Sequence, residues 1–242
     1  MTHRRGATVL AILLAAAAAL SLLHVLAARP WPVIRAQSRP LEVLPELSAA
    51  RLAARNFLRE PSVVVPVEHS GEWVRVFTQA RQRLPSDPAG TDPAGTDSFE
   101  ALAPAQTSAW LHADSLSSPP ILTNRIIVSV SAQTLSIIGV GSRTWPVGVG
   151  APGTPTPIGV TGNLEARYRD AAQGQAEHPV QLTSLHSTAA DEPFGGNDGG
   201  LIGIHFQTWA SGAVSHGCIR VPLEAIAAVN ALPLGTLITI EE

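Results

Sequence analysis

The sequence predicts a mainly β, turn-rich protein. Twenty glycines and twenty prolines among 242 residues, with an aromatic content of only 5%, favour short strands joined by tight turns over a bundle of helices. A hydrophobic content of 45% is enough for a buried core. The formal net charge is −3, from 16 basic and 19 acidic residues, and no basic footprint stands out, so we expect no nucleic-acid partner.

The N-terminus predicts an export signal. Arg4 and Arg5 precede an uncharged, largely apolar run from Gly6 to Ala28, and this order keeps the arginines on the cytoplasmic side of a membrane. The run is long enough to span a bilayer as an anchor helix, while the small residues at its end also permit cleavage as a signal peptide. We therefore expect an extracytoplasmic protein on the cell-wall or periplasmic side, either membrane-anchored through this helix or secreted.

Composition shifts divide the chain into four segments. Residues 1–28 are the signal anchor or signal peptide, and residues 29–61, rich in Arg, Pro and Ala, predict a membrane-proximal spacer with a helix. A small β-rich module follows at 62–118 and contains a flexible loop at 86–98, in which Asp-Pro-Ala-Gly-Thr occurs twice in succession. Residues 122–242 form the second domain. We interpret the module as a spacer, and a binding role is the alternative.

Local patterns predict the elements of these segments. In the first half of the chain we expect a helix near 47–58 and strands at 62–67, 72–77 and 108–114. In the second domain we expect a hairpin at 125–138, a third strand at 144–148 and a rigid turn at 153–159. An irregular polar stretch at 163–200 then leads to a strand at 201–205, a helix at 222–232 and a last strand at 236–240.

Cys218 is the only cysteine in the chain. In an exported protein a single cysteine pairs between molecules or remains a free reactive thiol. Two imidazoles, His205 and His216, and the cation of Arg220 lie within a few residues of it in the sequence. Because a thiol needs a nearby base to act as a nucleophile near neutral pH, this cluster predicts cysteine-dependent acyl transfer.

The residues around Cys218 support this interpretation. Gly217 permits a tight backbone, and the amide groups of residues 216–218 are candidates to hold an oxyanion. A helix that begins directly after Cys218 would add a favourable dipole at the thiolate. Two alternatives are a buried cysteine that only fills the core and a zinc site built from His205, His216 and Cys218, which lacks an obvious fourth ligand.

Residues from about 122 to 242 resemble the catalytic domain of the bacterial L,D-transpeptidases. The run Ser-His-Gly-Cys-Ile-Arg is the most specific of the matching motifs. The motifs that carry the resemblance occur in order at Arg125–Val130, Gly148–Gly150, Thr154–Gly159, Ile204–His205, Ser215–Arg220 and Gly235–Thr236. The resemblance implies a β-sandwich-like catalytic fold with a few short helices. The region around Trp73 and Trp110 also resembles, more weakly, a small β module that precedes this domain in some members.

The resemblance implies a nucleophile and a base by position. Cys218 would be the nucleophile, His205 would be the general base and acid, and the backbone carbonyl of Phe206 would orient His205. The family usually has glycine after this histidine and a somewhat longer loop, whereas here Phe206 follows and nine residues separate His205 from Ser215.

Four further residues receive roles from the same resemblance. His216 and Gly217 would shape the oxyanion region, Ser215 would support it by hydrogen bonding, and Arg220 would hold the loop or a substrate carboxylate. His216 remains the alternative base.

The implied reaction is peptidoglycan cross-linking. Cys218 would attack the bond after the third residue of a stem peptide, and an amine of a second stem would resolve the acyl-enzyme to give a 3→3 cross-link. Neither a metal nor another cofactor is implied, and carbapenem-type β-lactams would acylate the same thiol. The alternatives are an L,D-carboxypeptidase on the same scaffold and a catalytically inactive wall-binding module.

Overall fold

The computed structural model describes residues 31–32, 34–36, 53–79, 104–117, 121–169, 177–189 and 200–242. Within these residues the protein is mainly β, as the composition predicts, with a single α-helix and one short 3-10 turn. The expected signal segment at 1–28 and the loop at 86–98 lie outside the described residues. Among the helices of the described residues, none is long and apolar enough to cross a membrane.

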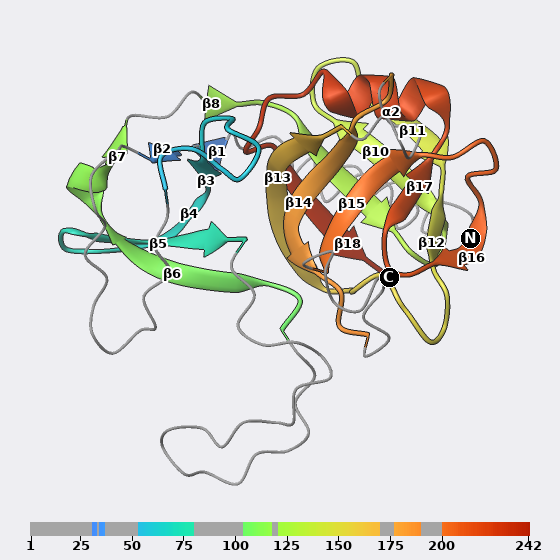
Figure 1. The fold of residues 1–242 in the computed structure, drawn as a ribbon, viewed down its shortest axis with the longest axis horizontal. Helices are drawn as coiled ribbons and strands as arrows, with labels where there is room; N and C mark the ends of the chain where they lie inside the picture. The colour runs from blue at the N-terminus through green and yellow to red at the C-terminus, as the bar shows by residue number, and fades with distance from the viewer. Residues whose placement is uncertain are drawn as a thin grey trace, which may run out of the picture.

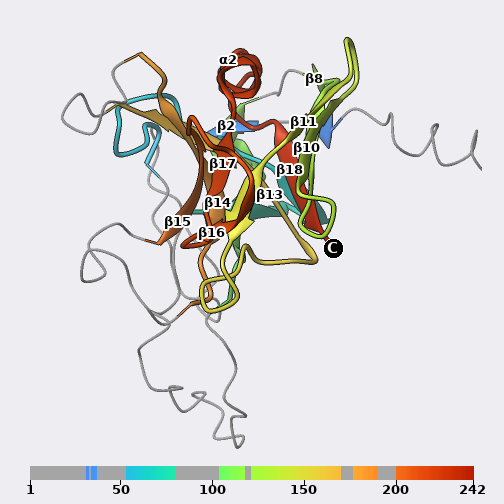
Figure 2. The same ribbon diagram turned by 90° about the vertical axis from the view of Figure 1, so that its right-hand side faces the viewer.

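The second half of the chain forms a ten-stranded sheet that curls on itself. Its strand order is β11-β10-β9-β18-β13-β14-β15-β17-β12-β16. Figure 2 shows β10, β11 and β18 on one side of the curl and β14, β15 and β17 on the other. The strands span Arg125–Ser129 (β9), Thr134–Ile138 (β10), Arg143–Pro146 (β11), Gly148–Gly150 (β12), Val160–Tyr168 (β13), Val180–His186 (β14), Leu201–Phe206 (β15), Gly212–Ser215 (β16), Ile219–Val221 (β17) and Leu237–Glu241 (β18).

The hairpin predicted at 125–138 is confirmed as the antiparallel pair β9 and β10. Alternate residues of both strands are buried, because successive side chains in a strand point to opposite faces. The last strand, β18, runs parallel to β9 and antiparallel to β13. It therefore joins the hairpin to the strands that carry the active-site motifs.

The hydrophobic core fills the inside of the curl, and α2 (Leu223–Asn230) covers one end of it (Figure 2). The helix buries Ala225, Ile226 and Val229 among the core side chains, which is the face its apolar spacing predicts. Pro222 is the residue before the first turn, and Pro233 lies shortly after the last one, where it cannot continue a helix. The helix predicted at 222–232 is thus confirmed.

The expectation that 163–200 is irregular was wrong for much of this stretch. β13 and β14 are central strands of the sheet and pair with each other. The pattern did not indicate strands because many of their buried residues are polar: Asn163, Glu165, Gln181, Thr183, Ser184 and His186. These side chains bond to backbone groups or to each other, so the strands stay buried without an apolar alternation.

The small module contains two three-stranded sheets, drawn on the left of Figure 1. One sheet is β4-β5-β6, in which β5 and β6 confirm the strands predicted at 72–77 and 108–114. The strand predicted at 62–67 is divided between β3 and the start of β4. Val64 of β3 packs with Val74, Val76 and Leu111 in one core. The other sheet has the order β3-β2-β7, and a separate pair joins β1 to β8. The bounds are Trp31–Pro32 (β1), Ile34–Ala36 (β2), Val63–Val64 (β3), Pro66–Ser70 (β4), Trp73–Thr78 (β5), Thr107–His112 (β6), Leu116–Ser117 (β7) and Ile121–Leu122 (β8), with the 3-10 turn η1 at Ala113–Ser115.

The spacer expected at 29–61 takes part in the fold. Residues 34–36 pair with β3 and β7, so they belong to the small module. The helix predicted near 47–58 is wrong for its described part, because 53–61 forms turns and one isolated bridge between Arg55 and Pro61. We call residues 53–61 the strap, since they bond to β13 of the ten-stranded sheet.

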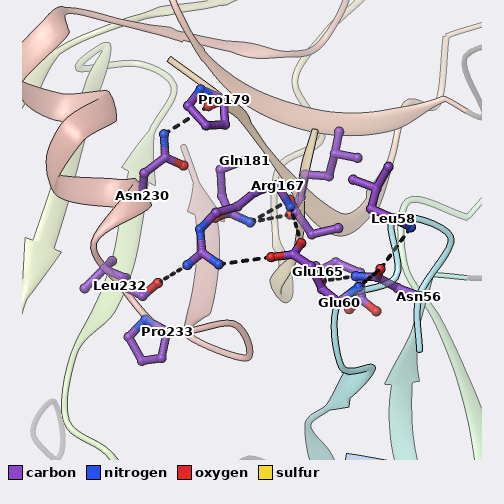
Figure 3. A network of polar contacts seen from close by, with 12 residues as sticks. Asn56, Leu58, Glu60, Glu165, Arg167, Pro179, Gln181, Asn230, Leu232 and Pro233 are labelled. Carbon is purple, nitrogen blue, oxygen red and sulfur yellow. Dashed lines mark hydrogen bonds and ion pairs between the residues drawn. The ribbon is translucent and has the colours of Figure 1, made fainter. Parts of the chain in front are cut away.

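The strap is fastened to β13 by a polar network (Figure 3). The Asn56 side chain accepts from the amides of Leu58 and Glu60, both at 3.0 Å, and its Nδ2 donates to the Glu165 carbonyl at 3.2 Å. The Glu60 carboxylate accepts from the Arg167 amide at 2.7 Å and pairs with the Arg167 guanidinium at 3.4 Å. Asn56 is buried, so these bonds replace water that the polar groups would otherwise bind.

A second polar contact joins the small module to β14. The His186 amide donates to the Ala105 carbonyl at 2.7 Å, and Nε2 of its ring lies 3.1 Å from the Gln79 carbonyl. Gln79 follows β5 and Ala105 precedes β6. The strap and the small module are therefore each bonded to an inner strand of the ten-stranded sheet.

Burial of Glu165 makes the free energy of unfolding depend on pH. Burial raises the pKa of its carboxyl from 4.5 to about 7, and the Asn163 side chain opposes this shift by donating a hydrogen bond. The folded state thus binds the proton more tightly than the unfolded chain does. The contribution of Glu165 to the free energy of unfolding is full below pH 4.5 and is lost as the pH rises through about 7. We expect Glu165→Gln to flatten the decline of Tm between pH 5 and 8, measured by thermal denaturation. An unchanged decline would contradict this.

The Asn56 side chain should matter for stability through its bonds. Asn56→Ala leaves the amides of Leu58 and Glu60 without their acceptor and the Glu165 carbonyl without its donor. We expect a loss of about 1–3 kcal/mol in the free energy of unfolding, measured by urea denaturation. Phe57→Ala is the matched control, because the neighbouring Phe57 is 61% exposed. Equal effects of the two substitutions would count against the role of the network.

Candidate active site

Two neighbouring parallel strands bring the predicted nucleophile and base together. β15 and β17 pair in the register Ile204 to Ile219 and His205 to Arg220. Cys218 lies one residue before β17, beside Gly203 of β15. His205 on β15 and Cys218 directly before β17 are thus carried by adjacent strands.

The thiol of Cys218 and the side chain of His205 lie on the same face of this pair. The Gly203 amide donates a hydrogen bond to Sγ of Cys218 at 3.4 Å. A Cβ at Gly203 would point toward this sulfur, at 3.7 Å. Because residues two apart in a strand project from the same face, His205 projects to the side on which the sulfur lies.

Gly203 was not singled out in the sequence. A Cβ there would lie 2.9 Å from Cγ1 of Val180, closer than side chains normally pack. Glycine within a strand is the local signal for such a close approach. The signal was present in Gly203-Ile204-His205, but it does not say which group approaches.

The His205 ring is held in one orientation and one tautomer. Its Nδ1 lies 3.2 Å from the backbone carbonyl of Phe206. A carbonyl oxygen only accepts, so Nδ1 carries the proton and Nε2 holds the lone pair. Burial lowers the pKa of His205 below 6.5, the Phe206 carbonyl raises it, and the charge of Arg220 lowers it further. The net shift is downward, so the ring is neutral at pH 7.

Phe206 fits at a position where the family pattern has glycine. Among the described residues only Arg59 and Gln133 are non-glycine residues with positive φ, so Phe206 needs no left-handed backbone. Its ring packs edge-on against His178, with the ring centres 5.2 Å apart. The carbonyl that orients His205 is a backbone group, so it is present with phenylalanine as it would be with glycine.

Residues 215–218, which we call the nucleophile loop, are fixed by their own hydrogen bonds. Ser215 is buried, and its hydroxyl donates to the Cys218 carbonyl at 2.6 Å and accepts from the Gly217 amide at 3.2 Å. Gly217 adopts φ +103°, which favours glycine. The amide of Gly217 is thus used inside the loop, which removes it from the candidate oxyanion donors.

Two threonines that the sequence placed only in a rigid turn contact this loop. Thr154 donates to the Ser215 carbonyl at 2.8 Å, and Thr156 donates to the Gly217 carbonyl at 2.8 Å. The Ser215 carbonyl also accepts from the Ala151 amide at 2.9 Å. The local signal was the repeated Thr-Pro, but nothing in it indicated a partner 61 residues away.

The helix expected directly after Cys218 is wrong. β17 follows the cysteine, and α2 begins only at Leu223. The strand forms because Ile219 and Val221 point into the core and their backbone pairs with β15. The sulfur of Cys218 thus accepts a hydrogen bond from the Gly203 amide, and no helix begins beside it.

The remaining predicted residues lie around the loop. His216 is exposed, and Arg220 is half-buried. The Nε of Arg220 is buried and finds no hydrogen-bond acceptor within the described part of the chain, and its charge acts on His205. In the described ranges no group of three His, Cys, Asp or Glu side chains is arranged to hold a metal ion.

Comparisons with known proteins identify a family for the second half of the chain. The family model of the YkuD L,D-transpeptidase catalytic domain matches residues 123–240. A search of the curated proteins finds no match.

Solved structures that resemble the chain are also L,D-transpeptidases. L,D-transpeptidase 1 of Mycobacterium tuberculosis is 19% identical, with a TM-score of 0.35, over 57% of this chain and 72% of that one. An L,D-transpeptidase from Mycobacterium smegmatis is 18% identical, with a TM-score of 0.37, over 84% of this chain and 100% of that one. L,D-transpeptidase 3 of M. tuberculosis, solved with a faropenem-derived adduct, is 17% identical, with a TM-score of 0.37, over 71% of this chain and 92% of that one.

The family match covers the strands that carry Cys218, His205 and the turn at 154–156. Residues 123–240 are therefore a catalytic domain of the L,D-transpeptidase family.

Proposed function

We propose that the chain is an exported L,D-transpeptidase in which Cys218 is the nucleophile and His205 is the general base and acid. The observation that carries the proposal is the arrangement of the two side chains on one face of adjacent parallel strands, with the Gly203 amide bonded to the sulfur. A neutral imidazole whose Nδ1 proton is held by the Phe206 carbonyl has its Nε2 lone pair available as a base.

The first half-reaction makes a thioester. Nε2 of His205 takes the thiol proton, and the thiolate attacks the carbonyl carbon of the third stem residue. Backbone amides of the nucleophile loop stabilise the negative oxygen that forms. The carbon–nitrogen bond then breaks, and the imidazolium returns its proton to the nitrogen of the departing D-alanine.

The second half-reaction makes the cross-link. A side-chain amine on the third residue of another stem attacks the thioester carbonyl, and His205 accepts the amine proton. The carbon–sulfur bond breaks and releases the Cys218 thiolate, which leaves a 3→3 amide. Water in place of the amine would give an L,D-carboxypeptidase.

The partners follow from this chemistry. Peptidoglycan stems are the donor and the acceptor, and carbapenem-type β-lactams acylate Cys218 because their strained amide carbonyl meets the same thiolate. Residues 1–28 would anchor the enzyme in the membrane or direct its secretion, with the catalytic domain on the cell-wall side.

Product analysis on purified tetrapeptide stems tests the proposal. We expect a cross-linked dimer that has lost one D-alanine, detected by mass spectrometry, and no product with Cys218→Ser or His205→Ala. Free tripeptide without dimer would contradict the transferase and support the carboxypeptidase. Absence of any product, together with absence of a meropenem adduct on Cys218, would point to an inactive wall-binding module.

The pKa of His205 sets the acid limb of the activity. Because burial and the charge of Arg220 lower this pKa, His205 stays neutral below pH 6.5. We expect kcat/KM to fall with a midpoint below 6.5 as the pH is lowered. Arg220→Met should raise that midpoint, whatever it does to the maximal rate, and Arg143→Met, at an exposed position of β11, should not. A wild-type midpoint above 6.5, or equal midpoints for both variants, would contradict this.

A further inference from the structure

We propose that Thr156 is a positioning residue for the reaction: its buried hydroxyl sets the orientation of the Gly217–Cys218 peptide, and hence the direction of the Cys218 amide beside the thiol. This inference rests on the proposed function, since it assigns a task within the acylation of Cys218. Thr156 lies 61 residues before Gly217, and its hydroxyl bonds to the backbone of Gly150 and Gly217.

The hydrogen bonds of Thr156 have a defined direction. The Gly150 amide donates to Oγ1 of Thr156 at 2.9 Å, so this oxygen acts as an acceptor there. Its single proton is then available for the Gly217 carbonyl, which lies 2.8 Å away. Thr156 is only 1% exposed, so water does not compete for either bond. The hydroxyl therefore links β12 to the nucleophile loop with fixed polarity.

The orientation of one peptide plane follows from this bond. The described peptides include no cis bond, and in a trans peptide the carbonyl and the next amide point in opposite directions. With its carbonyl held at Thr156, the Gly217–Cys218 peptide directs the Cys218 amide away from the turn at 154–156. In acyl transfer to Cys218, the oxyanion forms beside the nucleophile, where such an amide has its largest effect.

The loop needs an external tether at this peptide. Gly217 has φ +103°, a region open to glycine in which its own backbone preference selects no single orientation. The turn also packs tightly: a Cβ at Gly150 would lie 2.3 Å from both the Thr154 carbonyl and the Thr156 amide, so only glycine permits this approach. A Cβ at Gly217 would lie 3.4 Å from the Pro155 carbonyl.

Thr154 provides a matched control from the same turn. Its hydroxyl donates to the Ser215 carbonyl, but that carbonyl also accepts from the Ala151 amide and keeps this partner in a Thr154→Val variant. The Gly217 carbonyl has the Thr156 hydroxyl as its hydrogen-bond donor. Loss of the Thr156 hydroxyl should therefore disturb the nucleophile loop, and loss of the Thr154 hydroxyl should leave the loop in place.

Two reactions of the same sulfur separate orientation from general damage. Acylation by meropenem forms an oxyanion, whereas alkylation by iodoacetamide needs the thiolate but forms none. With the full chain we expect Thr156→Val to slow acylation by about 10- to 100-fold, less than the roughly 100- to 1000-fold typical of deleting an oxyanion donor. Alkylation should stay within about twofold, Thr156→Ser should restore acylation, and Thr154→Val should acylate within about threefold of the wild type.

The outcomes are distinguishable. Wild-type acylation in Thr156→Val, an equal fall in alkylation, or no recovery in Thr156→Ser would each overturn the inference while leaving the proposed function intact. If Thr156→Val does not fold, the acylation rates of Thr156→Ser and Thr156→Ala are compared instead. Both variants lack the methyl group, and they differ only in the hydroxyl. A wild-type chain that is alkylated but never acylated would overturn the proposed function and this inference together.

Discussion

The parallel pairing of β15 with β17 is the constraint on which the active site depends. It places Cys218, one residue before β17, beside Gly203, whose backbone amide donates to the sulfur. The missing side chain of Gly203 makes room for Val180. His205 then follows two residues later on the same face. The relative position of thiol and imidazole is therefore a property of strand register, which is stiffer than any arrangement of the loop between them.

Register alone does not shape the backbone around the nucleophile. That task falls to hydrogen bonds from three directions: Ser215 within the loop, the turn at 154–156 from β12, and Gly203 from β15. The loop carries a glycine with positive φ, so its own preferences leave it free to adopt several conformations. Two of these hydroxyls, those of Ser215 and Thr156, belong to buried side chains, so water does not compete for their bonds.

Two central strands of the ten-stranded sheet bond to the first half of the chain. The inner strands β13 and β14 carry buried polar groups, and the strap and the ends of β5 and β6 bond to their backbone (Figure 3). One of these groups, Glu165, is a carboxyl whose burial shifts its pKa into the physiological range. The junction is thus polar and directional, and it orders a segment whose composition predicted only a spacer.

The sequence by itself determined the mainly β class, the hairpin of β9 and β10, the strand with His205, the helix α2, and Cys218 with its neighbours. Each of these depends on a local pattern: alternation, helical spacing, or residues adjacent in the chain. It did not determine β13 and β14, because polar side chains satisfied inside the fold erase the alternation. Nor did it indicate Gly203 at the sulfur, Thr156 at Gly217 or Asn56 at Glu165. Those contacts join residues 15, 61 and 109 positions apart, and only the order and register of the ten-stranded sheet decide which of them meet.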